Sequence, residues 1–292
     1  MVKTLDKLTE YGVELTGYLH DASPEMPHRA SRPAVIFCPG GGYEILSDRE
    51  KDPPALEFFA RGYNVFILMY SLKERACGLH PLKELSAAVM TVREKAAVYH
   101  IDPKCVAVAG FSAGGHLAAS LGVRWNSPEL RAEMDTKNGL NRPDAMILCY
   151  PVITAGPWAH RPSIEWVSGS KTPCPLWDYF SLEKNVPADA APAFIWHTVT
   201  DDGVPVENAL LFASALRQAK VPFELHLFAG GPHGLSTCNE EVGSPNPESR
   251  KWVDLSLSLI HISGLVSCER DYKACFLLFG LHQNKECPLI YS

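Results

Sequence analysis

The pentapeptide Gly110–Gly114 (G-F-S-A-G) contains the side chain best suited to act as a nucleophile, the hydroxyl of Ser112. The apolar run Cys105–Ala109 precedes the pentapeptide, and the helix-forming stretch His116–Ser120 follows it. A serine at such a strand–turn–helix junction is typical of a nucleophile elbow, in which a tight turn exposes the hydroxyl. Glycines on either side of the serine allow strand and helix to approach closely. The alternative is an ordinary turn in a doubly wound sheet.

A serine hydroxyl is a weak nucleophile until a base takes its proton, and that base must be oriented by an acid. Among the eleven histidines, His233 lies in the glycine-rich segment Gly230–Gly234, directly after an apolar strand-like run. We predict it as the base, with a solvated loop residue as the alternative. Three other histidines lie in predicted strands or helices and are interpreted as structural: His116, His197 and His226.

Two aspartates lie between the serine and the histidine in the chain, at the carboxyl end of the predicted strand Ala193–His197. Ligand sites of open α/β sheets collect at this edge. Asp201 stands at a D-x-x-V-P spacing often seen for such an acid, so it is predicted as the third member of a Ser112–His233–Asp201 triad. Asp202 is interpreted as a candidate cap of the following helix.

A glycine-rich loop, Cys38–Tyr43 (C-P-G-G-G-Y), follows another predicted strand. Three consecutive glycines leave main-chain N–H groups free to point at an anion. A phosphate cradle is one interpretation, but no G-K-[ST] follows and no acidic ribose partner is suitably placed. Beside a serine nucleophile an oxyanion hole is favoured, in which Gly41 and Gly42 donate together with Ala113. Tyr43, next to the loop, is predicted to line the substrate site.

Short apolar runs alternate with helical patterns along the chain, which predicts a mostly parallel sheet with helices on both faces. Most runs contain about five apolar residues, as expected for strands buried on both sides. The predicted strands are Val13–Tyr18, Ala34–Cys38, Asn64–Tyr70, Cys105–Ala109, Ala145–Cys149, Ala193–His197 and Phe223–Phe228.

Apolar residues at helical spacing predict the helices between these strands. The predicted helices are Lys83–Tyr99, Val206–Gln218, Arg250–Ile260 and one that begins at Pro53 and ends near Arg61. On the second of these, the side chains expected to face inward are Leu210, Leu211, Ala213 and Leu216.

These motifs resemble those of α/β-hydrolases of the esterase/lipase group, in particular bacterial acetyl esterases and acetylxylan-esterase-like sugar esterases. The resemblance runs from about Val13 to about Ile260 and rests on PGGGY, GFSAGGH, LCYPVIT, IWHTVTDDGVPVEN and GGPHG. It implies an α/β-hydrolase fold with a mostly parallel central sheet flanked by helices and a small irregular cap. It also implies the triad and oxyanion roles given above. Proline precedes the three glycines where many relatives carry histidine, which argues against the hormone-sensitive-lipase branch.

The sequence predicts one hydrolase domain over residues 1–262, with a cap-like insertion at residues 124–192 that is rich in Pro, Trp and Ser. Long loops in a compact domain are usually functional. Residues 263–292 show no clear period and are interpreted as an atypical, non-native tail, with a small extra helix as the alternative. The aromatic residues of the insertion could stack on a sugar or form the core of the cap: Trp125, Trp158, Trp166, Trp177, Tyr179 and Phe180.

The composition excludes several classes of protein. Twenty-seven basic and 33 acidic residues give a net charge of −6, which argues against nucleic acid or anionic lipid as a partner. No run of eighteen apolar residues occurs and charges interrupt the first twenty positions, so neither a transmembrane helix nor a secretory signal is expected. Nine cysteines without a C-x-x-C pair indicate a reduced, cytoplasmic protein.

We therefore expect a serine esterase that hydrolyses a small-molecule ester by two-step acyl transfer and requires neither a metal nor an organic cofactor. The short, acetyl acyl group and the sugar alcohol are implied by the resemblance alone. A peptidase or amidase with the same triad is an alternative, as is a non-catalytic binding protein on the same scaffold.

Overall fold

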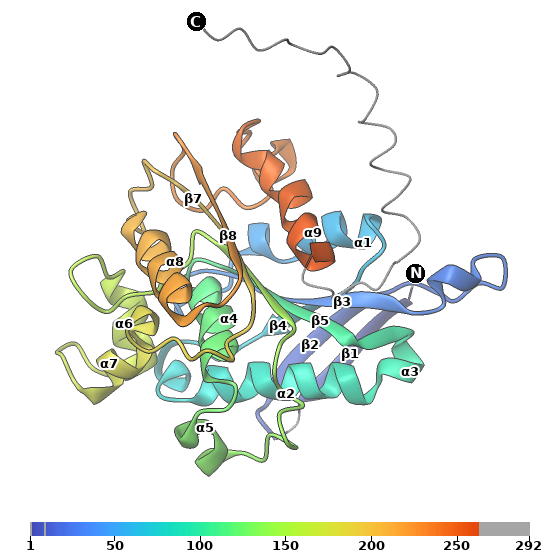
Figure 1. The fold of residues 1–292 in the computed structure, drawn as a ribbon, viewed down its shortest axis with the longest axis horizontal. Coiled ribbons are helices and arrows are strands. Elements are labelled where there is room, and N and C mark those ends of the chain that lie inside the picture. The colour runs from blue at the N-terminus through green and yellow to red at the C-terminus, as the bar shows by residue number, and fades with distance from the viewer. Residues whose placement is uncertain (1, 9, 263–292) are drawn as a thin grey trace, which may run out of the picture.

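A single eight-stranded sheet forms the centre of the protein, as seen in a computed structural model that describes residues 2–8 and 10–262 (Figure 1). The strand order is β1-β2-β4-β3-β5-β6-β7-β8. Strands β3 to β8 are mutually parallel, whereas β2 pairs antiparallel with both β4 and β1. The strands are β1 (Val2–Leu8), β2 (Val13–Leu19), β3 (Arg32–Cys38), β4 (Asn64–Met69), β5 (Ile101–Phe111), β6 (Ala145–Cys149), β7 (Ala193–Thr198) and β8 (Phe223–Phe228).

Helices cover both faces of the sheet, which confirms the predicted fold class (Figure 1). Successive side chains of a strand point to opposite faces. Accordingly Ile36 packs into the core beneath α2, α4 and α8, whereas Phe37 packs into the core beneath α1 and α9. The long helices are α1 (Asp52–Ala60), α2 (His80–Glu94), α4 (Ala113–Arg124), α8 (Glu207–Ala219) and α9 (Trp252–Ile262), and the short α3 (Ala96–Tyr99) follows α2.

The edge strand β1 was not predicted. It pairs with β2 along its whole length, but Leu5 is exposed and Leu8 is its buried apolar side chain. An edge strand is held by main-chain hydrogen bonds on one side and tolerates charged residues. It therefore lacks the apolar run by which the inner strands were found.

The apolar face predicted for α8 is partly wrong. Leu210 and Leu211 are 44% and 37% exposed, whereas Phe212 is fully buried. The buried apolar positions of α8 are Ala209, Phe212, Ala213 and Leu216, at spacings i, i+3, i+4 and i+7. Leu210 and Leu211 lie one and two positions after Ala209 and so fall outside this stripe, whereas Phe212 lies on it and fills the core.

The segment 124–192 contains β6 and three short α-helices: α5 (Pro128–Glu133), α6 (Arg161–Ser168) and α7 (Pro175–Phe180). Trp177 and Phe180 are buried and Trp158 is 46% exposed. The aromatic residues of the insertion therefore divide between the core and the surface. Residues 263–292, predicted as an atypical tail, lie outside the described residues. Within residues 2–8 and 10–262, no helix combines the length and apolarity needed to cross a membrane.

The burial pattern of α8 predicts opposite outcomes for two neighbouring truncations. Phe212→Ala removes a fully buried ring and should lower the free energy of unfolding by about 3–5 kcal/mol. Leu210→Ala, on the exposed side, should change it by less than about 0.5 kcal/mol. Urea unfolding followed by circular dichroism measures both. Equal losses for the two variants would contradict the assigned helix face.

Candidate active site

Ser112 occupies a sharp turn between β5 and α4, with a φ of +54° that non-glycine residues seldom adopt. The flanking glycines are required by close packing. A Cβ added to Gly110 would lie 2.1 Å from the carbonyl oxygen of Gly114, and one added to Gly114 would lie 2.0 Å from that of Cys38. The turn therefore has the strained, tightly packed geometry expected of a nucleophile elbow.

Three side chains that are distant in sequence form a hydrogen-bonded chain. Ser112 Oγ lies 2.8 Å from His233 Nε2, and His233 Nδ1 lies 2.8 Å from Asp201 Oδ2. Because a carboxylate only accepts, Nδ1–H donates to Asp201, which leaves Nε2 free to accept the serine proton. The arrangement can thus move a proton from the hydroxyl to the imidazole.

Asp201 is enclosed by donors, and its side chain is 1% exposed. Burial alone would raise the pKa of Asp201, but hydrogen bonds from His197 and His233 and from the Val204 N–H outweigh burial and hold this pKa well below its usual range. Oδ1 accepts from the N–H groups of Gly203 and Val204 at 2.9 and 2.8 Å, and His197 Nε2 lies 3.2 Å from Oδ2. The carboxylate therefore stays charged beside the imidazole.

The suggested role of Asp202 as a helix cap is wrong. The N-cap of α8 is Val206, and Asp202 Oδ1 instead lies 3.5 Å from the main-chain nitrogen of His233. His197 was predicted as a structural histidine, and it is fully buried, with Nε2 2.9 Å from the Val204 carbonyl oxygen. Its additional contact with Asp201 was missed, because only the fold of the loop after β7 brings the two together.

The glycine loop after β3 packs against the serine. A Cβ added to Gly40 would lie 3.0 Å from Ser112 Cβ, and the Gly40 N–H is already bound to Glu50 Oε2 at 2.8 Å. The N–H groups of Gly41, Gly42 and Ala113 donate to no protein group in the part of the chain that the structure describes. These are the three donors that the sequence singled out, and they remain free to bind an oxygen.

A buried carboxylate ties this loop to the segment that follows His233. Glu50, 3% exposed, accepts the Gly40 N–H with Oε2 and the hydroxyl of Tyr150 with Oε1 at 2.6 Å. The Tyr150 hydroxyl oxygen in turn accepts the N–H of Ser236 at 2.8 Å. Burial raises the pKa of Glu50, and the hydrogen bonds from Tyr150 and Gly40 partly offset that rise. Sequence reasoning missed this network because Glu50 and Tyr150 are 100 positions apart.

The prediction that Tyr43 lines the substrate site is wrong for its side chain. The ring is 1% exposed, and its hydroxyl lies 2.9 Å from His116 Nδ1. His116 Nε2 donates to the carbonyl oxygen of Phe180 at 2.9 Å, so Nδ1 accepts from Tyr43. This hydrogen bond anchors Tyr43, the last residue of the glycine loop, to α4, and His116 is the structural histidine that the sequence indicated.

His160, which the sequence analysis did not select, lies beside the glycine loop. Its Cε1 is 3.7 Å from the place where a Cβ on Gly42 would be. Its Nδ1 is 2.8 Å from Ser163 Oγ, and the residue precedes α6 as its N-cap. Burial, followed by the nearby His233, lowers the pKa of His160. The beginning of α6 therefore forms part of the wall of this site.

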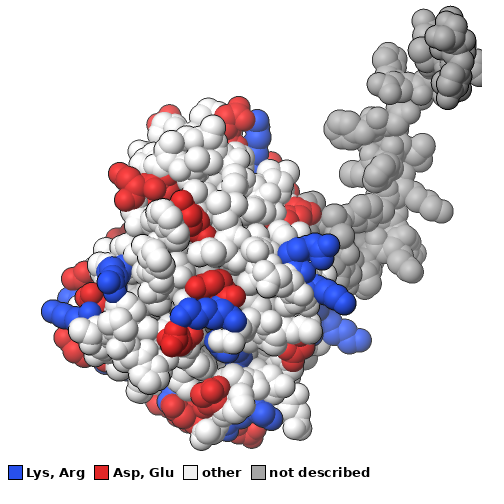
Figure 2. All heavy atoms as spheres, turned by 60° about the vertical axis from the view of Figure 1, so that its left-hand side comes forward, with Lys and Arg blue, Asp and Glu red and all other residues white. Residues whose placement is uncertain are grey.

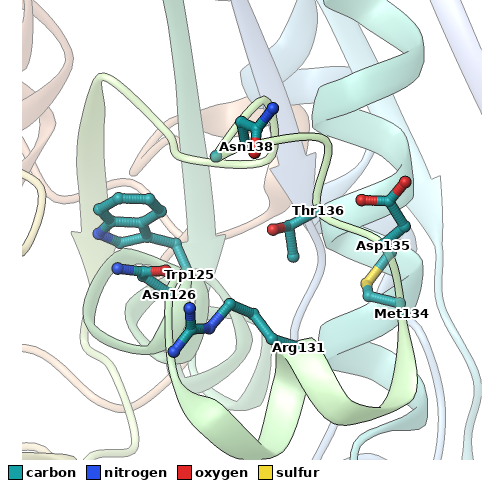
Figure 3. Close-up of a pocket in the computed structure, with 8 residues that line it drawn as sticks. Trp125, Asn126, Arg131, Met134, Asp135, Thr136 and Asn138 are labelled. Atoms are coloured by element: carbon teal, nitrogen blue, oxygen red, sulfur yellow. The ribbon is translucent and has the colours of Figure 1, made fainter.

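The surface around these elements has no strongly charged patch. Figure 2 brings forward the side where α6, α7 and α8 lie in Figure 1 and shows acidic and basic side chains interspersed among large uncharged areas. A hollow of about 460 Å³ lies elsewhere, at the end of α4 that carries Trp125 and beside Arg131 of α5 (Figure 3). Ser112 and Trp125 flank opposite ends of α4, so the length of this helix, about 18 Å, separates them. That hollow is separate from the triad.

Comparison with known proteins matches the BD-FAE family model to residues 22–216. The chain is 40% identical over 238 residues to Endo-1,4-beta-xylanase B of Butyrivibrio fibrisolvens, covering 79% of this chain and 36% of that protein. It is 30% identical over 221 residues to Acetylxylan esterase of Xylanibacter ruminicola, covering 72% and 42%. The chain thus spans less than half the length of these curated relatives.

Solved structures agree with the architecture. The acetyl ester-xyloside bifunctional hydrolase from Caldicellulosiruptor lactoaceticus superposes with a TM-score of 0.75 at 33% identity, over 90% of this chain and 92% of that one. The fold of this protein is the α/β-hydrolase fold, as the sequence motifs implied.

The buried His116 predicts a specific dependence of stability on pH. Burial lowers its pKa from 6.5 to about 4, so between these values the unfolded chain binds a proton at this residue and the folded protein does not. The free energy of unfolding should therefore fall as the pH falls through this window, by up to about 3 kcal/mol from this residue. Urea unfolding of His116→Gln between pH 7 and 4 should show a shallower decline than the wild type. Parallel curves for the two proteins would exclude this contribution.

Proposed function

The chain belongs to the BD-FAE family, and from that premise we propose that it is a serine esterase that releases short acyl groups, above all acetate, from acetylated sugars. The observation that carries the proposal is the hydrogen-bonded chain from Ser112 through His233 to Asp201. The proposed oxyanion hole is formed by the free N–H groups of Gly41, Gly42 and Ala113, which border that chain.

The proposed reaction begins when Ser112 Oγ attacks the ester carbonyl carbon and His233 Nε2 takes the hydroxyl proton. The carbonyl oxygen becomes negatively charged and accepts hydrogen bonds from the three main-chain donors. Removal of one such donor in related sites costs about 3–4 kcal/mol of transition-state stabilisation. Asp201, whose low pKa keeps it ionised, stabilises the imidazolium through Nδ1–H.

The tetrahedral intermediate then expels the alcohol. His233 donates its proton to the leaving alkoxide, and Ser112 retains the acyl group as an ester. Water enters, His233 takes one of its protons, and the resulting hydroxide attacks the acyl carbon. The second intermediate releases the carboxylic acid, and His233 returns the proton to Ser112. Apart from the ester and water, these steps use only side-chain and main-chain groups of the chain.

The sugar part of the proposal rests on the relatives. Their names specify xylan, an acetylxylan and an acetyl ester-xyloside as the compounds on which those proteins act. All six cysteines within residues 2–8 and 10–262 are free thiols, which fits the proposed cytoplasmic location. There the enzyme would act on acetylated oligosaccharides that have been taken up rather than on polymeric xylan.

Replacing the nucleophile tests the proposal. Ser112→Ala should lower the turnover of p-nitrophenyl acetate by at least about 10⁴-fold, because no other group forms the acyl-enzyme. A fluorophosphonate probe should label the wild type and not the variant, whose thermal unfolding serves as the control for folding. Wild-type activity in Ser112→Ala would refute the mechanism. A preference for octanoyl over acetyl esters would refute the short acyl group, and faster turnover of aminoacyl p-nitroanilides would indicate a peptidase instead.

The Glu50 network predicts a smaller effect on the same reaction. Glu50→Gln keeps the shape but leaves a single acceptor oxygen for two donors, so the glycine loop should lose its fixed position. With p-nitrophenyl acetate we expect kcat to fall about tenfold, the equivalent of one charged hydrogen bond, and KM to change less than about twofold. Glu44→Gln, an exposed carboxylate on the same loop, is the matched control. Equal kcat values for the two variants would contradict the positioning role.

A further inference from the structure

A hollow of about 490 Å³ lies between α6 and the short helix Lys73–Ala76. We propose that it is a subsite that binds a sugar ring of the alcohol part of the substrate, one or more rings away from the ester that Ser112 attacks. The inference rests on the esterase function proposed above and adds a specificity-determining site to it. The residues that carry the argument are Glu74, Cys77, Pro162, Glu165, Trp166 and Lys171.

Both walls of the hollow are attached to the glycine loop of the active site. The main-chain N–H of Lys73 donates to the Tyr43 carbonyl oxygen at 2.7 Å. On the other wall, His160 at the start of α6 lies against Gly42. Trp166 is six residues further along α6, about 9 Å along the axis. A chain of sugar rings is long enough to cover this length of α6, whereas a small alcohol is not.

The lining has the chemistry of a site for a neutral sugar. Trp166 is half-buried and packs against the core, and no residue in the described ranges accepts a hydrogen bond from its indole Nε1–H. Such a ring offers an apolar face for the C–H surface of a sugar and a polar edge for a hydroxyl. The apolar side chains of Cys77 and Pro162 extend this surface.

Three charged groups of the lining are unused in the described structure. Glu74, Glu165 and Lys171 make no side-chain hydrogen bond or ion pair with any described residue. Two carboxylates accept hydrogen bonds from hydroxyl groups, and one ammonium donates to them. The excess of one negative charge disfavours a phosphate or an acidic sugar. The mixed surface in Figure 2 gives no attraction for such anions either.

In the other hollow, which Trp125 lines, the tryptophan already has partners within the chain. The indole N–H of Trp125 already donates to the carbonyl oxygen of Asp189 at 3.2 Å, and the guanidinium of Arg142 lies 5.5 Å from its ring centre. This tryptophan is engaged by its own chain and lies at the far end of α4 (Figure 3). Trp125 is therefore a suitable control for a substitution of Trp166.

The test compares two substrates, acetylated xylotriose and p-nitrophenyl acetate, in wild type, Trp166→Leu, Glu165→Gln and Trp125→Leu. For Trp166→Leu we expect KM for the trisaccharide to rise about five- to tenfold, the usual contribution of a ring contact. Glu165→Gln should raise KM about threefold, whereas kcat/KM for p-nitrophenyl acetate should stay within about twofold of wild type in both. Trp125→Leu should leave both substrates unaffected.

Several outcomes would overturn the subsite. An unchanged KM for the trisaccharide in Trp166→Leu, or an equal rise in Trp125→Leu, would exclude specific recognition at this hollow. An equal loss of kcat/KM for p-nitrophenyl acetate in Trp166→Leu would show that the substitution disturbs the fold of the active site and not the binding of a sugar. If the wild type hydrolyses p-nitrophenyl acetate but not the trisaccharide, the subsite is excluded and the esterase function stands. Wild type inactive on both would refute the function itself.

Discussion

The unusual backbone conformation of Ser112 is the constraint on which the rest of the site depends. A non-glycine residue with φ of +54° is strained and persists only where its surroundings impose it. Here the surroundings are the close contacts of Gly110 and Gly114, which leave no room for a Cβ on either side. Because Gly114 has no side chain, α4 also packs closely against the Cys38 carbonyl at the start of the glycine loop. These two packing contacts therefore fix the serine at the turn and bring the glycine loop close to it.

Two buried carboxylates stabilise this site in different ways. Asp201 is surrounded by donors, and its lowered pKa keeps a full charge next to the imidazole of His233. Glu50 is also buried but has fewer donors around it, so burial raises its pKa. It acts through geometry by holding Gly40 and Tyr150. The first orients the base of the proposed reaction, and the second connects the glycine loop to the loop of that base. Loss of either would leave donors or acceptors unpaired in a buried environment.

The parallel sheet explains how side chains from distant parts of the chain meet. Ser112, Asp201 and His233 follow β5, β7 and β8, and the carboxyl ends of parallel strands lie at one edge. The helix α6 reaches the same edge from the insertion, with His160 against the glycine loop and Trp166 in the neighbouring hollow. A change in the insertion can thus alter what the site binds without disturbing the triad.

The sequence by itself predicted the inner strands, the longer helices and the residues of the proposed triad and oxyanion hole. These follow from local rules, namely apolar runs, helical spacing and the need for glycine in tight turns. Only the tertiary structure decided that Tyr43 points into the core, that Phe212 rather than Leu210 and Leu211 faces the sheet, and that Asp202 caps no helix. It alone joined Glu50 to Tyr150 and His197 to Asp201. The reason is physical: periodicity reports which side of an element is buried, whereas the partner of a buried polar group depends on contacts between residues that no local pattern connects.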